Sequence, residues 1–396
     1  MDYAATTPVD KQVVLVMGKF WEENFGNPAA LYEEGRKAKL AREDSRRKIA
    51  KILNAGTQEI VFTAGGTESV NLAILGFAKA QKKRPSHFIT STIEHHAVLK
   101  SFTELERREF KTTYLPVNSY GQVLLSDLKN KINNSTVFVS VMYANNEVGS
   151  IQPIAEIGKW LKSLNRKRLK ENLPQIIFHT DASQAAGVLD LDVQKLGVDL
   201  LTLNGSKIYG PKQTGILFVR SGVGLEPLIL GGGQEKNLRS GTENIPGIVG
   251  LAKALELAQI NYARENARLL NLRNYFYDRI LKSIKNVKLN GPQLDKKMSA
   301  ELKRLPNNLS LSFLGLEGES LMLYLDAYGI SVATGSACAE LGTEPSHVLA
   351  ALGLPKRQVQ SSIRITLGKF TTKKDLNYVL TVLMPVVREL RSVKSF

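Results

Sequence analysis

A chain of 396 residues with 43% hydrophobic and 23% charged residues has the composition of a globular protein with a large core. Its single cysteine excludes a disulfide within the chain, and no apolar run reaches the roughly 20 residues of a membrane span, so we expect no membrane contact. The net charge of +16 comes from short Lys/Arg clusters without interleaved aromatic residues, which favours a solvated basic surface over a nucleic-acid site. The first eight residues lack the basic start and apolar core of a signal peptide, so we expect a cytoplasmic protein.

Residues 57–220 alternate short apolar runs with amphipathic stretches, the first run leading through a glycine turn into a helix over 69–81. Continuous apolar runs separated by helices predict a mostly parallel sheet with helices on both faces. The polar, basic stretch Ser163 to Gln175 is predicted to be a surface excursion between a helix and a strand. Five of these runs end in polar residues, and open α/β sheets bind ligands at the carboxyl ends of their strands.

After Gly233 the pattern changes to long helical stretches over 247–285, followed by a mixture of strands and helices. Helices are predicted near 318–328 and 345–352, and a final one from Thr372. This mixed order indicates a smaller α+β domain.

Three of the strand ends carry features of one chemistry. The "GGTES" of Gly65 to Ser69 offers backbone N–H groups at a helix start, which suits a phosphate but is also a common steric turn. Asp181 ends a buried strand, where it either meets a cation or caps the next helix. Lys207 follows another strand, where it is either a Schiff-base lysine or one that extends its amine to solvent. A phosphate site, an acid and an aldehyde-binding lysine are together what pyridoxal phosphate requires.

Four further side chains fit around such a cofactor. His95 can stack on a ring, Asn146 and Gln184 are amides at neighbouring strand ends, and Arg364 is a candidate clamp for a carboxylate. Each of these residues is ordinary by itself, so the prediction depends on their common location.

The only cysteine, Cys338, lies in "VATGSACAEL". A lone cysteine is often a small buried hydrophobic residue. Its small neighbours and the polar run after it instead favour an exposed loop, where a thiolate can react.

With these motifs the chain resembles the cysteine desulfurases of the nitrogen-fixation and iron–sulfur-cluster type, in the class V aminotransferase family of fold type I pyridoxal-phosphate enzymes. The resemblance extends over nearly the whole length, through "DYAATTP", "FGNP", "GGTES", "EHHAV", "NNEVG", "DASQ", "SKIYGPK", "RSGTEN", "GSAC", "EPSHVL" and "SSIR". It implies a seven-stranded sheet, a large cofactor-binding domain over 10–255, and a small domain formed by 1–9 and 256–396.

The resemblance also implies a role for each site residue and no metal site. Lys207 binds the cofactor aldehyde and moves the substrate's α-proton. Around the ring, Asp181 pairs with the pyridine nitrogen, Gln184 faces the ring hydroxyl and His95 lies over the ring. The phosphate is held by Gly66, Thr67 and Ser206 together with Thr242 of a second subunit, and the substrate is oriented by Asn146 and Arg364.

The implied reaction converts L-cysteine to L-alanine, with the sulfur taken by Cys338 as a persulfide. The sulfur then passes to acceptor proteins such as an iron–sulfur scaffold, and the enzyme is a homodimer. Five residues between Cys338 and Glu344 resemble the longer-loop branch of the family that serves scaffolds.

The chain departs from the family at several positions. Ser206 stands where the family usually has His, Asn204 replaces a usual Ser, and the chain begins at the point where relatives have a short apolar strand. Three alternatives remain open at this point: a selenocysteine lyase or class V aminotransferase, a catalytically silent cofactor-binding assembly platform, and a tRNA-binding protein.

Overall fold

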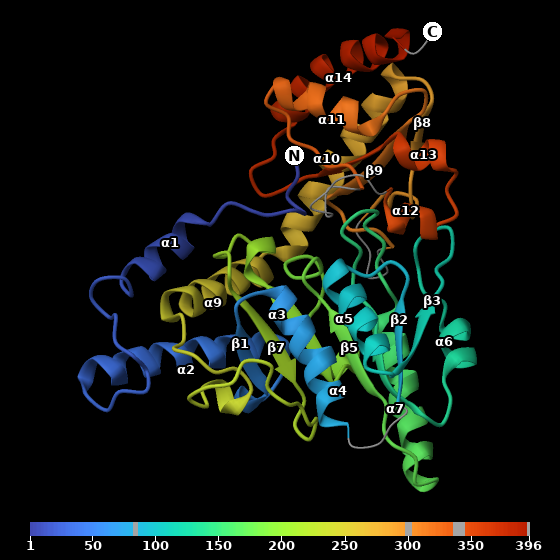
Figure 1. Cartoon of the computed structure of the whole chain (residues 1–396). Helices are drawn as coiled ribbons and strands as arrows, with labels where there is room; N and C mark the ends of the chain where they lie inside the picture. The colour runs from blue at the N-terminus through green and yellow to red at the C-terminus, as the bar shows by residue number, and fades with distance from the viewer. Residues whose placement is uncertain (82–85, 298–302, 336–344, 394–396) are drawn as a thin grey trace.

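The computed structural model describes residues 1–81, 86–297, 303–335 and 345–393. A seven-stranded sheet forms the larger part, in the order β1-β7-β6-β5-β4-β2-β3 (Figure 1). Strands β2 to β6 pair in parallel, while β7 is antiparallel to both β6 and β1. The prediction of a mostly parallel seven-stranded sheet is confirmed. The strands are β1 Ile60–Thr63, β2 His87–Ser91, β3 Lys111–Leu115, β4 Thr136–Ser140, β5 Ile177–Asp181, β6 Leu200–Asn204 and β7 Gly215–Val219.

Helices cover both faces of this sheet, so consecutive residues of one strand are buried on opposite faces. Phe88 packs with helices α3 to α5, while Ile89 packs with the layer containing α1, α2 and α6 to α9. Leu200 and Leu201 divide in the same way, as expected for a strand buried on both faces. The helices are α1 Lys11–Gly18, α2 Glu33–Leu53, α3 Gly66–Asn71, α4 Phe77–Ala80, α5 His96–Arg107, α6 Leu125–Lys131, α7 Ile154–Lys170, α8 Val193–Leu196 and α9 Ile245–Ile260.

Two predicted segments differ from the structure. The helix expected over 69–81 begins at Gly66, and its α3 and α4 parts are joined by a π-helical stretch, Leu72–Gly76. The predicted excursion at 163–175 is wrong for its first half, which is the end of α7. Arg168 explains this helix: it is buried, and its guanidinium donates to the carbonyls of Asn133, Asn134 and Thr136.

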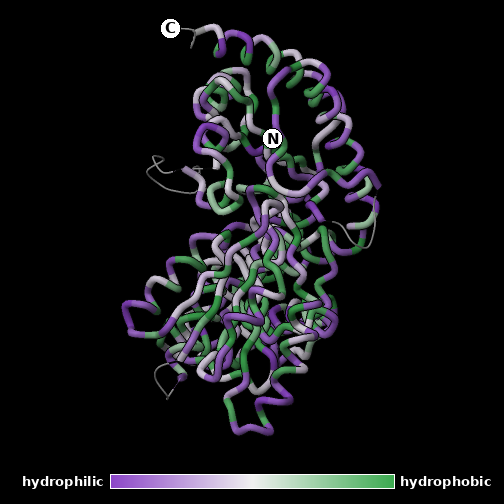
Figure 2. Tube along the Cα trace, turned by 90° about the vertical axis from the view of Figure 1, so that its right-hand side faces the viewer, coloured by the Kyte–Doolittle hydropathy of each residue, from purple (hydrophilic) through white to green (hydrophobic). Residues whose placement is uncertain are grey.

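The remaining elements form a second apolar core around a three-stranded antiparallel sheet, β10-β9-β8. In Figures 1 and 2 this part lies above the large sheet, and it contains the last described helix of the chain. The N-terminus joins it through a parallel bridge between Asp2 and Thr366. The division at residues 9/10 and 255/256 remains a prediction. The elements are α10 Tyr262–Ser283, β8 Val287–Leu289, β9 Asn308–Phe313, α11 Gly318–Ala327, α12 His347–Ala351, α13 Lys356–Gln360, β10 Ser362–Thr366 and α14 Lys373–Val393.

Of the helices in the described residues, none combines the length and apolar character needed to cross a membrane.

Candidate active site

A cavity of about 390 Å³ lies where the carboxyl ends of the central strands meet the small domain. Strands β4, β5 and β6 lead into its wall, and the N-terminal segment and β10 contribute the other side. Its lining residues are Ala4, Ala5, Gly66, Thr67, His95, Ala97, Met142, Ala144, Asn146, Asp181, Ser183, Gln184, Asn204, Lys207 and Arg364. Eight of the residues predicted from the sequence are therefore gathered around one space.

Asp181 is the last residue of β5, and its carboxylate is 9% exposed. Its Oδ1 accepts the backbone N–H of Ser183 at 2.9 Å, which fixes the carboxylate at the cavity wall. Beneath it on the same strand, His179 is fully buried between Ser140 and Thr202, whose hydroxyls lie 2.8 and 3.1 Å from its ring nitrogens. Burial lowers the pKa of His179 to about 4, so this imidazole is neutral and supports Asp181 without adding charge.

Lys207 ends a short 3₁₀ turn, Gly205–Lys207, that follows β6 directly. Asn204 starts this turn by accepting the Ser206 N–H at 3.1 Å on its Oδ1. Gly205 is required there, because a Cβ would overlap the hydroxyl of Thr214. The turn directs Lys207 back over the strand end, where its Nζ donates to the carbonyl of Ala5.

The start of the helix at 66–71 forms the opposite end of the cavity. Gly65 has a φ of +133°, a conformation that suits glycine. In the described structure no side chain caps this helix, so the N–H groups of its first turn remain available to an anion. A Cβ on Gly66 would lie 3.3 Å from both Ser183 Oγ and Asn204 Nδ2, so a hydroxyl and an amide face the same spot. Backbone and side-chain donors thus form an anion site of the kind a phosphate needs.

His95 is the N-cap residue of α5, and its Nδ1 accepts the N–H of Ala97 at 3.1 Å. The ring is open to the cavity, yet the surrounding protein removes enough water to lower its pKa. The nearby charge of Lys207 also lowers this pKa, while Asp181 opposes the effect. Because Nδ1 is an acceptor, the neutral ring carries its proton on Nε2.

Arg364 comes from the middle of β10 and closes the cavity from the small domain. Its Nη2 pairs with the Asp2 carboxylate at 2.8 Å, and its Nη1 donates to the carbonyl of Asn146 at 3.3 Å. In the part of the chain that the structure describes, its buried Nε has no hydrogen-bond partner. A guanidinium with an unused donor at a cavity wall suits a carboxylate ligand.

Two other predicted residues are not among those that line the cavity, and a third is outside the described residues. The Ser206 hydroxyl donates to Oδ1 of the wall residue Asn204 at 3.0 Å, and its contact with a phosphate remains a prediction. Thr242 is exposed and away from this cavity, so it has no part in the site of its own subunit. Cys338 lies outside the described residues.

Two wall residues with polar side chains were not predicted from the sequence. Asn204 was noted only as a departure from the family, although it ends β6 just as Asp181 ends β5. Ser183 was passed over inside the "DASQ" motif. The rule that strand ends carry the site applies directly to Asn204 and was the signal available for it.

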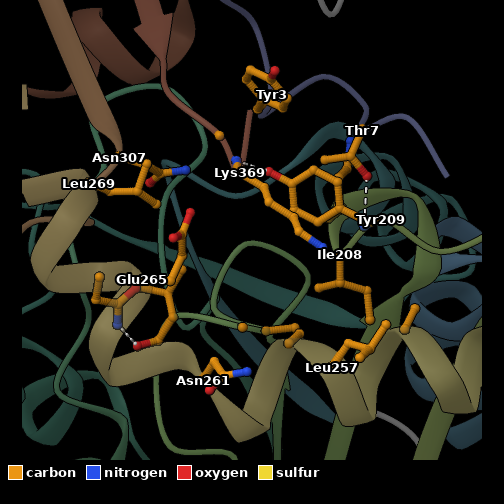
Figure 3. Close-up of a pocket in the computed structure, with 18 of the residues that line it drawn as sticks. Tyr3, Thr7, Ile208, Tyr209, Leu257, Asn261, Glu265, Leu269, Asn307 and Lys369 are labelled. Atoms are coloured by element: carbon orange, nitrogen blue, oxygen red, sulfur yellow. Dashed lines mark hydrogen bonds between the residues drawn. The ribbon is translucent and has the colours of Figure 1, made fainter. Parts of the chain in front are cut away.

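Gln184, predicted to face a ring hydroxyl, donates its side-chain N–H to the carbonyl of Ala4 at 3.0 Å. It lines both this cavity and a second one of about 660 Å³. In the second cavity, shown in Figure 3, Lys369 is paired with Asp10 and Arg268 with Glu265, while Arg264 and Lys207 also line the wall. The smaller cavity is the one that brings Lys207 together with Asp181, His95 and Arg364.

The comparisons with known proteins agree with this geometry. A model of the aminotransferase class-V family matches residues 1–379. A cysteine desulfurase IscS of Dictyoglomus turgidum is 46% identical over 396 residues, which are 100% of this chain and 96% of the relative. A solved structure described as a NifS-like protein has a TM-score of 0.89 and 37% identity, covering 98% of this chain and 99% of the other. A structure described as SspA in complex with cysteine has a TM-score of 0.77 and 34% identity, covering 94% and 99%.

The chain belongs to the aminotransferase class-V family. Within this pyridoxal-phosphate-dependent family it falls among the cysteine desulfurases, as its motifs predicted.

Proposed function

We propose that this protein binds pyridoxal phosphate in the 390 Å³ cavity and uses it to convert L-cysteine to L-alanine. The observation that carries the proposal is the gathering of Asp181, Lys207 and His95 on one cavity wall, with an anion site at one end and Arg364 at the other. The donor set fits the group: an amine for its aldehyde, a carboxylate for its ring nitrogen, and a helix start for its phosphate.

When bound, pyridoxal phosphate supplies an electron sink that loosens the bonds to the substrate's α-carbon. The amine of Lys207 holds the aldehyde and carries the α-proton at Nζ. The Asp181 carboxylate holds a proton on the pyridine nitrogen. Gly66 and Thr67 donate backbone N–H groups to the phosphate, and Ser183 and Asn204 face the same end of the cavity.

The substrate is held by its carboxylate at the Arg364 guanidinium, which lines the cavity beside Asn146. His95 offers an Nε2 proton to the substrate side of the cavity. The thiolate of Cys338 takes the sulfur: a sulfur–sulfur bond forms, the bond from sulfur to the β-carbon breaks, and its electron pair stays with the carbon that becomes the alanine methyl group. The similarity to a structure described as a complex with cysteine supports this choice of substrate.

The test is to incubate the purified protein with pyridoxal phosphate and L-cysteine and to measure alanine and sulfide. We expect equal amounts of the two in the presence of a reductant. Lys207→Ala and Cys338→Ala should abolish both products, whereas the exposed Lys195→Ala should change neither. Full turnover of cysteine by Cys338→Ala would overturn the mechanism and favour a selenocysteine lyase or aminotransferase. Cofactor absorbance without any product would favour a silent assembly platform.

We also propose a homodimer in which Thr242 of one copy completes the phosphate site of the other. Residues 14–40 carry several large exposed apolar side chains, which support an interface with a second copy. They are Val14, Leu15, Trp21, Phe25, Leu31, Tyr32 and Leu40. Mixing inactive Lys207→Ala with Thr242→Ala subunits should restore activity, because one site of each mixed dimer is intact. Activity that stays at the level of the separate variants would contradict a shared site.

We propose that the persulfide sulfur goes to acceptor proteins such as an iron–sulfur scaffold. We also propose a cytoplasmic location, because the single cysteine of the sequence cannot form a disulfide within the chain. The two apolar cores support a large domain over 10–255 and a small domain formed by 1–9 and 256–396.

A further inference from the structure

We propose that Glu147 is a positioning residue that holds both ends of the Cys338-bearing segment next to the substrate clamp Arg364. This inference rests on the proposed sulfur transfer to Cys338. It concerns the described residues that flank 336–344 and the carboxyl group that joins them.

The C-terminal end of the segment is fixed through Ser346. Its Oγ donates to Glu147 Oε2 at 2.5 Å and accepts the N–H of Leu349 at 3.1 Å. Ser346 is therefore the N-cap residue of α12 and also a hydrogen-bond donor to the Glu147 carboxyl group. It is 4% exposed, so water does not compete strongly for this contact.

The N-terminal end of the segment arrives at the same point. A Cβ built on Gly335 would overlap Ser346 Cβ and lie 3.0 Å from Glu147 Oε2. Residues 335 and 346 are thus in contact although ten residues separate them in the sequence. Any side chain at 335 would push the two ends apart, which is a direct reason for glycine there.

The backbone of Glu147 is held from both parts of the molecule, by Asn145 in the large part and by Asn308 of β9 in the small part. Its N–H and that of Val148 donate to Asn145 Oδ1 at 2.8 and 2.9 Å, and its carbonyl accepts from Asn308 Nδ2 at 3.1 Å. The backbone carbonyl of the preceding residue, Asn146, accepts a hydrogen bond from Arg364. One short turn therefore connects the substrate clamp with the base of the thiol-bearing segment.

The electrostatics agree with this arrangement. Burial raises the pKa of Glu147 to about 7, while the Ser346 hydroxyl and the charge of Arg364 oppose the rise. Arg364 is in turn paired with Asp2. A carboxyl group that is 5% exposed is unfavourable in a core unless it makes specific contacts, and here those contacts are the segment end and the clamp.

If Glu147 positions the Cys338-bearing segment, loss of its side chain should slow sulfur transfer and leave substrate binding nearly unchanged. In the holoenzyme, Glu147→Ala should leave the cofactor spectrum and its change on cysteine addition nearly intact, with KM within about threefold. The kcat for alanine should fall about 10- to 100-fold, because a misplaced reacting group costs rate of this order. The rate of Cys338 alkylation by iodoacetamide should also change.

Three variants make the test specific. Ser346→Ala should lower kcat in the same way, and the double variant should be no worse than the more impaired single one, since both remove one contact. Glu59→Ala is the matched control, because Glu59 is a buried carboxyl that accepts from Gly56 and Ser221 far from the cavity.

Wild-type activity separates the two hypotheses. If the wild type forms no alanine from cysteine, the proposed function fails. If it does, and Glu147→Ala keeps both kcat and the Cys338 alkylation rate, the positioning role alone is refuted. Additive losses in the double variant would also refute it.

Discussion

The buried Glu94 makes a quantitative prediction about stability and pH. Its side chain is fully buried; Oε1 accepts from Ser91 Oγ at 2.6 Å and from the Met142 N–H at 2.9 Å. In the described structure Oε2 has no hydrogen-bond partner. Burial raises the pKa of Glu94 to about 8, and the charge of Asp181 adds to the rise. The native state therefore keeps a proton that the unfolded chain loses above its ordinary pKa of 4.5.

The sign follows from proton binding. Between pH 4.5 and about 8 the native state binds one more proton at Glu94 than the unfolded state, so this residue's contribution to the free energy of unfolding falls as the pH rises. At about 1.4 kcal/mol per pH unit, the interval corresponds to roughly 4 to 5 kcal/mol, an upper limit because water penetration and relaxation reduce it. Glu94→Gln has no such proton to lose, so its stability should depend less on pH.

The measurement is the thermal midpoint of wild type, Glu94→Gln and the exposed control Glu171→Gln at pH 6 and pH 9. The amide oxygen of the Gln variant can accept both hydrogen bonds, so its thermal midpoint should match that of the wild type only near pH 4.5. At pH 6 the wild type has lost about 2 kcal/mol and should unfold roughly 4 °C below the variant, and at pH 9 the difference should widen to roughly 8 to 10 °C, at about 2 °C per kcal/mol for a large domain. Parallel pH curves for the Gln variant and the wild type would refute the assigned protonation.

Three further predictions address the cofactor, the core and the pH profile. Gly66→Ala should weaken pyridoxal phosphate binding about tenfold in a spectrophotometric titration, because a Cβ 3.3 Å from Ser183 Oγ narrows the anion site. Unchanged affinity would argue against a phosphate site at Gly66. Glu235→Ala should lower the free energy of unfolding by up to about 3 to 5 kcal/mol in urea, because it removes the buried carboxylate that pairs with Arg46 and leaves only the more exposed Glu43 as its ion-pair partner; a loss below about 1 kcal/mol would contradict this. The acidic limb of kcat/KM should lie below pH 6.5 and disappear in His95→Gln, because burial lowers the pKa of His95; a limb above 6.5 would exclude His95 as its source.

The sheet and the position of its site were predictable because they depend on local patterns. Asp181 and Lys207 follow apolar runs that are too continuous for a half-exposed strand, and parallel strands bring their carboxyl ends to one edge. The pairing of those particular strands needed no further information. The site was therefore predicted before any contact was known.

The orientation of individual side chains was not predictable in the same way. Ser206 is next to the lysine in sequence, yet its hydroxyl donates to the Asn204 side chain, and it is not among the residues that line the cavity. The polar end of α7 has the composition of a loop. It is helical because Arg168 reaches four backbone carbonyls that are distant from it or lie beyond the helix end. The second outcome depends on tertiary hydrogen bonds that override local preference, whereas the first depends on a local side-chain contact between residues two apart.

The substrate end of the cavity depends on contacts between the extremes of the chain. Arg364 from β10 pairs with Asp2, and both flank Thr366, whose hydroxyl accepts the N–H of Ala4 at 2.9 Å. The same N-terminal segment accepts the Lys207 amine at Ala5. One short strand-like segment therefore fixes the clamp from one side and the lysine from the other. Since Asp2 occupies Nη2 and leaves Nε unused, the guanidinium is oriented before any substrate arrives, which reduces the ordering that binding requires.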